Sequence, residues 1–442
     1  MAQSPEYWNI EPRDIISAYR HLSGIFDASP AFHYTTVMPS GRKVRILVKC
    51  EHVNSMKTFK IRGAEIKVSK IASSFLGQYE KSRQLALEGE VPNPSHVYSL
   101  SELELVTASA GNHAQGVALA ASRWGIPAKI FIPVGTPAPK LERLLRVANA
   151  ASAMQINIVN SGNAFDETLS HCLQYSESPS DSSARKKIFV SPYDDSAVIA
   201  GQGTVLAEYL LSCVPGMFSR NLLRMLNPAN AEYLEEHMLI PDVVIAGLGG
   251  GGLTCGMGAF AQHINYLLGS HMRVVGVQSE HADSMFQSFH NGGLHPGSDS
   301  GKTIADGIAV KNASLRMYRT VQRYVDDIVR VSDEEIMRAI GEFHWHPLFH
   351  KKSCQIGEYM DPECPERRIP GNKNHFTLRR PLDVIEGAAG AALAGIAHLD
   401  YGKLGIDKEN VTVLAILSGG NIGNELMQRI VSEYQPEVRA WH

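Results

Sequence analysis

Four short segments of the chain carry residues that could take part in chemistry, and each follows a run predicted to form a strand. The first, residues 58–64, places Lys60 between Phe59 and Ile61 at the predicted start of a helix. Desolvation and the helix dipole both lower the pKa of a lysine in such a place, which makes its amine a usable nucleophile. Most lysines are instead solvated surface residues, so this segment alone leaves both interpretations open.

The second segment, residues 109–116, leads into a predicted helix and suits a bound carboxylate. Its small residues expose backbone N–H groups, and the hydroxyl of Ser109 is expected to cap the helix. The alternative is that Ser109 is only a helix cap and that His113 is an ordinary helix histidine. Taken alone, this segment does not separate the two.

The third segment has four consecutive glycines, Gly249, Gly250, Gly251 and Gly252, followed by Leu253 at the start of a predicted helix. Backbone without side chains lets several N–H groups converge on a phosphate, and the helix dipole assists. The pattern matches neither the Walker A motif nor the dinucleotide-binding fingerprint. A flexible turn is the alternative, but ordering four glycines costs chain entropy, which favours a functional site.

The fourth segment, residues 418–421, follows the last predicted strand and begins with Ser418. A serine at a strand end can present its hydroxyl to a ring nitrogen of a ligand, or it can cap the last helix. All four segments lie beyond predicted strands. Because ligands of open α/β sheets bind outside the carboxyl ends of the strands, we expect one common site.

The elements that position these segments alternate between strand-like and helix-like runs. Apolar, β-branched runs predict strands, and helical spacing of apolar residues predicts the helices between them. Such alternation predicts an α/β chain with a mainly parallel sheet covered on both faces. The predicted strands are 45–53, 128–133, 243–248, 273–278 and 411–417, and the predicted helices are 59–75, 113–124, 140–148, 256–268 and a closing one.

Three segments do not fit the alternation. Residues 176–187 are rich in serine and charge and are predicted to form a loop, and residues 214–242 are predicted to add helical material. Residues 344–381 follow neither period. They hold His344, His346, His350, Cys354, Cys364 and His375. Zinc is one hypothesis, but no C-x-x-C occurs, so a lid or interface loop that alters substrate choice is preferred.

The composition excludes several classes of protein. A net charge of -3 over 442 residues gives no positive field for nucleic acid. The uncharged run 243–269 contains glycines, Gln262 and Asn265, so no membrane span is expected there. Six cysteines are too few for a disulfide scaffold, and no targeting segment is recognised, which favours the cytoplasm.

In this chain order, the four segments resemble those of the fold type II family of pyridoxal-phosphate (PLP) enzymes, and more narrowly its threonine/serine ammonia-lyase (dehydratase) branch. The matching segments are T-F-K-I-R-G-A, S-A-G-N-H-A-Q-G, A-G-Q-G-T, G-G-G-G-L, T-I-A-D-G-I-A-V and L-S-G-G-N. The resemblance implies two open, mainly parallel twisted sheets with helices on both faces, as in tryptophan synthase β. It also implies a large PLP-binding domain, residues 1–106 and 197–442, and a small substrate-binding domain, residues 107–196.

The resemblance implies a role for each matching residue. Lys60 would carry PLP on its amine and take the α-proton of the substrate, and Ser418 would face the pyridine nitrogen. Glu386 is expected to border the ring, although Gly387, where the family usually has proline, is predicted to loosen that turn. The other cofactor-binding residues would be Phe59, Asn112, Gly249, Gly250, Gly251, Gly252 and Leu253, and the substrate carboxylate would lie among Ser109, Ala110, Gly111, Asn112 and His113.

The implied reaction is β-elimination of L-threonine, L-serine or a related hydroxy amino acid to a 2-oxo acid and ammonia. A hydroxyl at Ser418 leaves the ring nitrogen neutral, which weakens the electron sink and favours prompt loss of a β-substituent. β-Replacement remains an alternative. Racemisation is disfavoured because Ala110 stands where related racemases have a second serine, and intact Lys60 and Ser418 argue against a non-catalytic PLP-binding protein. A homodimer is expected, and no metal, because residues 280–284 are closer to the metal-free pattern.

Overall fold

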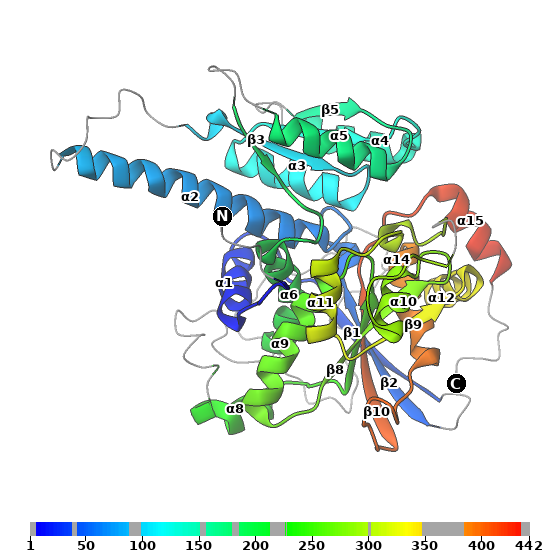
Figure 1. Ribbon diagram of the computed structural model, residues 1–442. Helices are drawn as coiled ribbons and strands as arrows, with labels where there is room; N and C mark the ends of the chain where they lie inside the picture. Colours follow the sequence, from blue (N-terminus) through cyan, green and yellow to red (C-terminus); the bar gives the residue numbers. More distant parts are fainter. Residues whose placement is uncertain are drawn as a thin grey trace. The chain divides into compact units, whose positions relative to one another are not determined.

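The computed structural model describes residues 6–37, 42–87, 99–150, 156–178, 185–212, 226, 228–298, 302–346 and 384–434. These residues form two compact units. The first, called the outer unit here, comprises Met1–Phe59 and Gln202–His442. The second, the inserted unit, is the continuous stretch Lys60–Gly201. Figure 1 shows the elements of both units with their labels.

The outer unit is built on a six-stranded sheet in the order β1-β2-β10-β7-β8-β9. The edge strand β1 runs antiparallel to β2, and all the other neighbours are parallel. The strands are β1 (Ala31–Val37), β2 (Lys43–Cys50), β7 (Val243–Gly247), β8 (Arg273–Ser279), β9 (Asp327–Val331) and β10 (Asn410–Leu417). The predicted strand 45–53 extends beyond the C-terminal end of β2, because Glu51–Val53 form a short 3-10 helix, η1.

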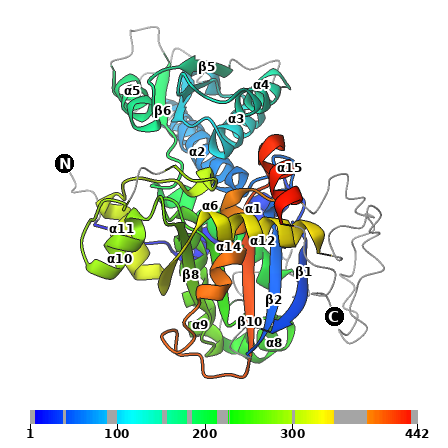
Figure 2. The ribbon, with the colours of Figure 1, turned by 90° about the vertical axis from the view of Figure 1, so that its right-hand side faces the viewer.

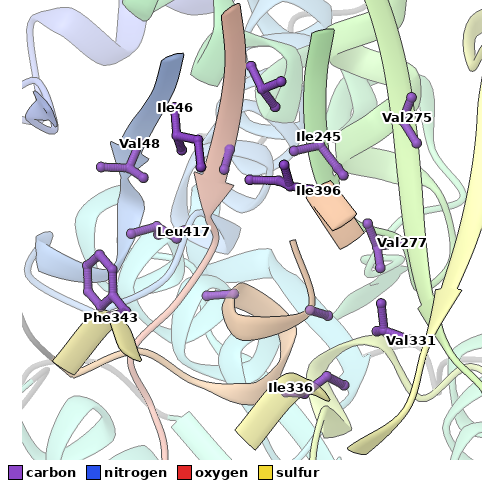
Figure 3. Packing of buried hydrophobic residues seen from close by; sticks show 14 of the residues in the cluster. Ile46, Val48, Ile245, Val275, Val277, Val331, Ile336, Phe343, Ile396 and Leu417 are labelled. Atoms are coloured by element: carbon purple, nitrogen blue, oxygen red, sulfur yellow. The ribbon is translucent and has the colours of Figure 1, made fainter. Parts of the chain in front are cut away.

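Helices cover this sheet on both faces. On one face the β-branched side chains of the strands pack against α12 (Asp333–Trp345), α14 (Gly387–Ala394) and α15 (Asn424–Glu433). In Figure 3, Phe343 and Ile336 of α12 approach Val48, Leu417 and Val331 of the strands. On the other face α9 (Gly252–Leu268) packs against β7 and β8, and α1 (Pro12–Ser23) packs on α9.

The remaining elements of the outer unit are shorter. They are α8 (Ala231–His237), α10 (Ser284–Asn291), α11 (Leu315–Tyr324), η3 (Pro228–Asn230), η4 (Asp306–Ile308) and η5 (Gly395–His398). Helix α6 (Ser196–Leu211) begins in the inserted unit and continues into the outer unit.

The inserted unit has its own four-stranded parallel sheet in the order β5-β4-β3-β6. Its strands are β3 (Leu103–Ala108), β4 (Ala128–Ile132), β5 (Ile156–Asn160) and β6 (Lys186–Phe189), preceded by η2 (Leu100–Glu102). Helices α3 (Asn112–Trp124) and α4 (Ala138–Ala150) cover one face, and α5 (Phe165–Glu177) covers the other (Figure 2). The long helix α2 (Lys60–Leu87) packs along α3.

The predicted fold class is confirmed, because both units are mainly parallel sheets with helices on both faces. The unit boundaries differ from the predicted 106/107 and 196/197 boundaries of the domains. A boundary after residue 106 would cut β3, whose residues 103–108 pair with β4 and β6. Helix α2 also belongs to the inserted unit, because its apolar face packs on α3 and β3.

The predictions for the three segments that did not fit the strand–helix alternation have different outcomes. The predicted loop 176–187 includes the end of α5 and the start of β6, and residues 179–184 lie outside the described part of the chain. Helix α8 lies in the stretch 214–242, where helical material was predicted. Residues 347–381 of the predicted lid or interface loop lie outside the described residues. Among the helices that are described, none has the length and apolar character needed to cross a membrane.

A buried group of charges joins three parts of the outer unit. The ammonium Nζ of Lys49, at the end of β2, donates to Glu208 Oε1 of α6 at 2.5 Å and to the carbonyl oxygen of Ser29 at 2.5 Å. Ser29 donates its own N–H to Glu208 Oε1 at 2.9 Å and its hydroxyl to Glu51. Lys49 is 1% exposed and Glu208 is 6% exposed, so the ammonium is the positive charge that compensates this carboxylate away from water.

Replacing Lys49 by methionine should destabilise the outer unit by about 3–5 kcal/mol, because Glu208 would remain buried without its cation. Urea unfolding followed by circular dichroism measures this as a lower midpoint concentration. The double variant Lys49→Met/Glu208→Gln should recover only part of the loss, since it removes the charge of Glu208 and leaves that of buried Glu51, 4.0 Å from Lys49 in the wild type. An unchanged midpoint in the single variant would show that the ion pair does not support the fold.

Candidate active site

Lys60 is the first residue of α2, and its amine has a defined partner within the inserted unit. Its Nζ donates to the carbonyl oxygen of Pro192 at 2.9 Å. Helix α3 comes close to the same place, because a Cβ on Gly116 would lie 3.1 Å from the carbonyl oxygen of Lys60. Lys60 is partly exposed. The carbonyl of Pro192, which holds its amine, is a neutral acceptor.

The acceptor belongs to residues 190–195, called the lysine-holding turn here. At its start, the carbonyl oxygen of Val190 accepts from Thr107 Oγ1 at 2.9 Å and lies 3.1 Å from His113 Nε2. At its end, Asp195 Oδ1 accepts from the N–H groups of Ala197 and Val198, at 2.9 and 3.1 Å, and so caps α6. The turn is thus fixed at both ends, and Pro192 between them faces Lys60.

Two further bonds stiffen the lysine-holding turn. Ser191 Oγ accepts from the N–H of Asp194 at 2.9 Å. Asp195 Oδ2 accepts from Lys67 Nζ of α2 at 2.6 Å, so the helix that begins with Lys60 also holds the end of the turn. Thr107, Pro192 and Asp195 are site residues that were not predicted from the sequence. Asp195 carried a signal, because an aspartate one residue before an apolar helical run is a typical N-cap.

His113 supports this turn as a neutral side chain. It is 3% exposed, and burial, together with the nearby charge of Lys60, lowers its pKa to about 3. A neutral ring donates from Nε2 to the carbonyl of Val190, which leaves Nδ1 as the unprotonated nitrogen. Nδ1 has no hydrogen-bond partner among the described residues. The ring of His113 is therefore hydrogen-bonded to the lysine-holding turn. The main-chain N–H is the part of His113 that remains to bind a carboxylate.

The segment predicted to hold a carboxylate forms the start of α3. Gly111 is the N-cap residue of this helix, and no side chain caps it. The prediction that Ser109 caps the helix was wrong, because Ser109 Oγ instead accepts from the N–H of Gly111 at 3.2 Å. The first turn, which begins with Asn112, has no acidic residue. Its N–H groups therefore suit a carboxylate, and Ala110 beside them adds no charge.

In the outer unit, the four glycines connect β7 to α9. Gly251 is the N-cap of α9 with φ +89, and a Cβ there would lie 2.8 Å from Val321 Cγ2. A Cβ on Gly249 would lie 3.1 Å from Ile308 Cα. No side chain caps α9 and no acidic residue lies in its first turn, which includes Gly252 and Leu253. This bare, uncapped helix start fits a bound phosphate group.

Ser418 lies at the end of β10 and is 2% exposed. Its carbonyl oxygen accepts from the N–H of Phe59 at 3.0 Å, and Thr58 forms an antiparallel bridge with Gly419. Gly420 donates its N–H to the carbonyl oxygen of Lys57 at 2.9 Å. The residues immediately before Lys60 are thus joined by backbone hydrogen bonds to the residues that follow β10.

The predicted ring-bordering residue, Glu386, is the N-cap residue of α14 and is 5% exposed. Its Oε2 accepts from the N–H of Asn421 at 3.2 Å, and a Cβ on Gly307 would lie 3.5 Å from its Oε1. Gly387 does not loosen this turn as predicted. A Cβ there would lie 2.7 Å from Ala305 Cα, so glycine allows α14 to pack against residues 304–305.

In the stretch 280–284, the buried carboxylate of Asp283 is taken up by four hydrogen bonds, whereas Glu280 is exposed. Asp283 accepts from Ser298 N at 2.6 Å, Ser298 Oγ at 2.7 Å, Gln287 Nε2 at 2.8 Å and Arg330 Nη1 at 2.8 Å. Across the part of the chain that the structure describes, no group of three His, Cys, Asp or Glu side chains is placed to hold a metal ion. Of the six residues considered for zinc, only His344 and His346 are described.

Comparison with known protein families identifies the family of this protein. The family described as "Pyridoxal-phosphate dependent enzyme" matches residues 30–346, which is most of the chain. The chain belongs to this PLP-dependent family. As a PLP-dependent enzyme it has both fitting features described above, a lysine at the start of α2 and a bare helix start for a phosphate.

Relatives narrow the resemblance. The PLP-dependent chain is 29% identical over 420 residues to the L-threonine ammonia-lyase of Thermotoga maritima, covering 95% of this chain and 78% of the relative. It is 29% identical to the catabolic L-threonine dehydratase of Escherichia coli K12, with 92% of each chain covered. The solved threonine deaminase isoform 2 of Solanum lycopersicum has the same fold, with a TM-score of 0.61, 22% identity, and coverage of 97% of this chain and 90% of that one.

The neutral state of His113 predicts a pH-dependent stability. Between its ordinary pKa of 6.5 and its folded-state pKa of about 3, the unfolded chain binds a proton at His113 that the folded chain does not. Stability is therefore lost as the pH falls below about 6.5. His113→Gln keeps an amide donor for Val190 and removes this titration.

Urea unfolding at several pH values from about 7 to about 5 measures the effect. The stability of His113→Gln relative to the wild type should rise as the pH falls, by up to about 1.4 kcal/mol per pH unit. His295→Gln, which changes an exposed ring, serves as the matched control. Parallel curves for the wild type and His113→Gln would contradict a neutral buried ring.

Proposed function

We propose that this PLP-dependent enzyme eliminates the β-hydroxyl of a hydroxy amino acid, L-threonine or L-serine or a close relative, and releases a 2-oxo acid and ammonia. The observation that carries the proposal is the amine of Lys60, held 2.9 Å from the Pro192 carbonyl at the start of α2. Relatives named threonine ammonia-lyase and threonine dehydratase, matched along 95% and 92% of this chain, support it.

The residues that would hold the cofactor are those that match the motifs of the family. The N–H groups at the start of α9, from Gly249 to Leu253, would bind the phosphate, and Lys60 would provide the covalent attachment. Phe59, Asn112, Ser418 and Glu386 would surround the ring. When bound, PLP supplies an electron sink for negative charge at the α-carbon of an amino acid.

Lys60 would move the α-proton. Pro192 supplies a carbonyl acceptor, which orients the amine. His113, which is hydrogen-bonded to the same turn, is neutral and adds no cation there. The lysine-holding turn therefore holds the base in place before it takes the proton.

The carboxylate of the substrate would bind at the start of α3, a helix whose N-cap residue provides no side-chain cap. Ser109 and Asn112 flank this place in the sequence. Ala110 cannot donate a proton to the α-carbon, which argues against racemisation. Loss of the hydroxyl as water leaves an enamine, which tautomerises and is hydrolysed to the 2-oxo acid and ammonia.

Ser418 favours elimination over transamination. Its hydroxyl cannot give the ring nitrogen a full positive charge as a carboxylic acid partner would, so charge at the α-carbon is less stabilised and the β-substituent leaves promptly. β-Replacement would need a second substrate to add to the enamine. Product analysis with and without an added thiol separates these two outcomes.

Lys60→Ala should lower the rate of 2-oxo acid release by about 10²–10⁴-fold or more, because the base is removed. Lys81→Ala, which changes an exposed lysine further along α2, is the matched control and should keep the wild-type rate. The assay is a panel of hydroxy amino acids with 2-oxo acid and ammonia both measured. Visible absorbance after addition of PLP should appear in the wild type and not in Lys60→Ala. Absence of 2-oxo acid from every substrate would remove this proposal.

We also propose that the enzyme is a cytoplasmic homodimer, as the resemblance to its family implies. Free, buried Cys50, Cys172 and Cys255 are compatible with a reducing compartment. Light scattering during gel filtration should give twice the 48.4 kDa mass of one chain. A mass of one chain, unchanged over a tenfold range of concentration, would argue against the dimer.

A further inference from the structure

A groove lies on the surface of the inserted unit, along α2. It has a volume of about 270 Å³, and its base is apolar, formed by Ile71, Phe75, Leu103 and Ile188. The α2 residues that line it recur at helical spacing and so form one face of that helix, while Leu103 begins β3 and Ile188 lies in the neighbouring β6. The groove is thus built from three elements of one unit.

The rim of the groove is basic. Lys67 and Lys70 of α2 and Lys186 of β6 line it, together with the polar side chains of Ser74 and Gln78, and no aspartate or glutamate does. Such a rim attracts an anion, and the apolar base favours an organic one. An amino acid would bring an ammonium that finds no carboxylate on this lining. The chemistry therefore selects a small carboxylate with an apolar body and no amine.

Lys67 connects the groove to the lysine-holding turn. Its Nζ donates to Asp195 Oδ2 at 2.6 Å, and both side chains are mostly buried, with exposures of 22% and 18%. Asp195 fixes the end of the turn by capping α6. Three residues earlier in the same turn, Pro192 accepts from the amine of Lys60. A charge bound in the groove can therefore reach the catalytic amine through three links. These are the ion pair of Lys67 with Asp195, the chain from Asp195 back to Pro192, and the hydrogen bond between Pro192 and Lys60.

We propose that this groove binds a small organic carboxylate, and that the bound anion slows the reaction through Lys67. The anion attracts the Lys67 ammonium and weakens its bond to Asp195. The end of the lysine-holding turn is then less fixed, and Pro192 orients Lys60 less well. The effect on turnover rests on the proposed function, whereas binding in the groove does not.

Benzoate is the probe for the site, because it is a flat apolar carboxylate without an amine. Its binding to the PLP-loaded enzyme is measured by calorimetry, and benzamide is the neutral probe of the same shape. Lys186→Gln should weaken benzoate binding about twofold to tenfold, as expected for one partly exposed charge. Lys81→Gln, on α2 outside the groove, should leave it unchanged. Equal affinity for benzoate in Lys186→Gln and wild type would overturn the site.

Asp195→Asn tests the coupling. Asparagine still caps a helix, so α6 keeps its start while the ion pair with Lys67 is lost. Benzoate should lower the kcat of the wild type with little change in KM, and it should still bind to Asp195→Asn without lowering kcat. If benzoate only raises KM, and does so equally in Lys186→Gln, it competes with the substrate carboxylate and the proposal fails.

A readout without turnover separates the two proposals. The rate at which Lys60 reacts with added PLP, followed by visible absorbance, should fall in the presence of benzoate in the wild type and not in Asp195→Asn. If the wild type forms no 2-oxo acid, the proposed function fails, yet this rate and the calorimetry still decide the groove. If benzoate leaves this rate unchanged in the wild type and in every variant, the proposed coupling between the groove and Lys60 is wrong.

Discussion

The position of Lys60 depends on a short antiparallel contact at the end of β10. Thr58 bridges Gly419, and the N–H of Phe59 donates to the carbonyl oxygen of Ser418. Because Lys60 follows Phe59 in the chain, this contact fixes the residue from which helix α2 continues. The antiparallel contact uses only backbone groups, so it does not depend on the side chains of the paired residues. The side chain of Ser418 remains available for a ligand.

A neutral carbonyl holds the catalytic amine. The acceptor of Lys60 is a carbonyl, the neighbouring His113 is neutral, and the start of α3 has no acidic residue. The ion pair of Lys67 with Asp195 lies at the other end of the turn. A carbonyl orients the amine without forming an ion pair that would have to break when the base accepts and returns a proton.

The sequence predicted the parts of the structure that depend on local pattern. Residues 243–247 and 411–417 are rich in valine, isoleucine, leucine and alanine, and the glycines from residue 249 onward mark the end of a strand, so both features could be predicted. The predicted helix 59–75 ended too early, because exposed polar residues such as Gln78, Glu80 and Lys81 interrupt the apolar spacing beyond residue 75. Contacts between distant segments had no local signal. Val190 with Thr107, Glu386 with Asn421, and the close approach at Gly387 could only be found in three dimensions.

The insertion of one unit into the other has a consequence for the order in which the chain can fold during synthesis. The inserted unit is continuous, so all four of its strands have been synthesised once residue 201 is made. In the outer unit, β2 pairs with β10 along Lys43–Cys50 and Asn410–Leu417. The central strand of that sheet is thus made long after β2, which until then has one unpaired edge. The inserted unit can therefore form before the outer sheet closes, and the long sequence separation makes the outer sheet the slower and more aggregation-prone part.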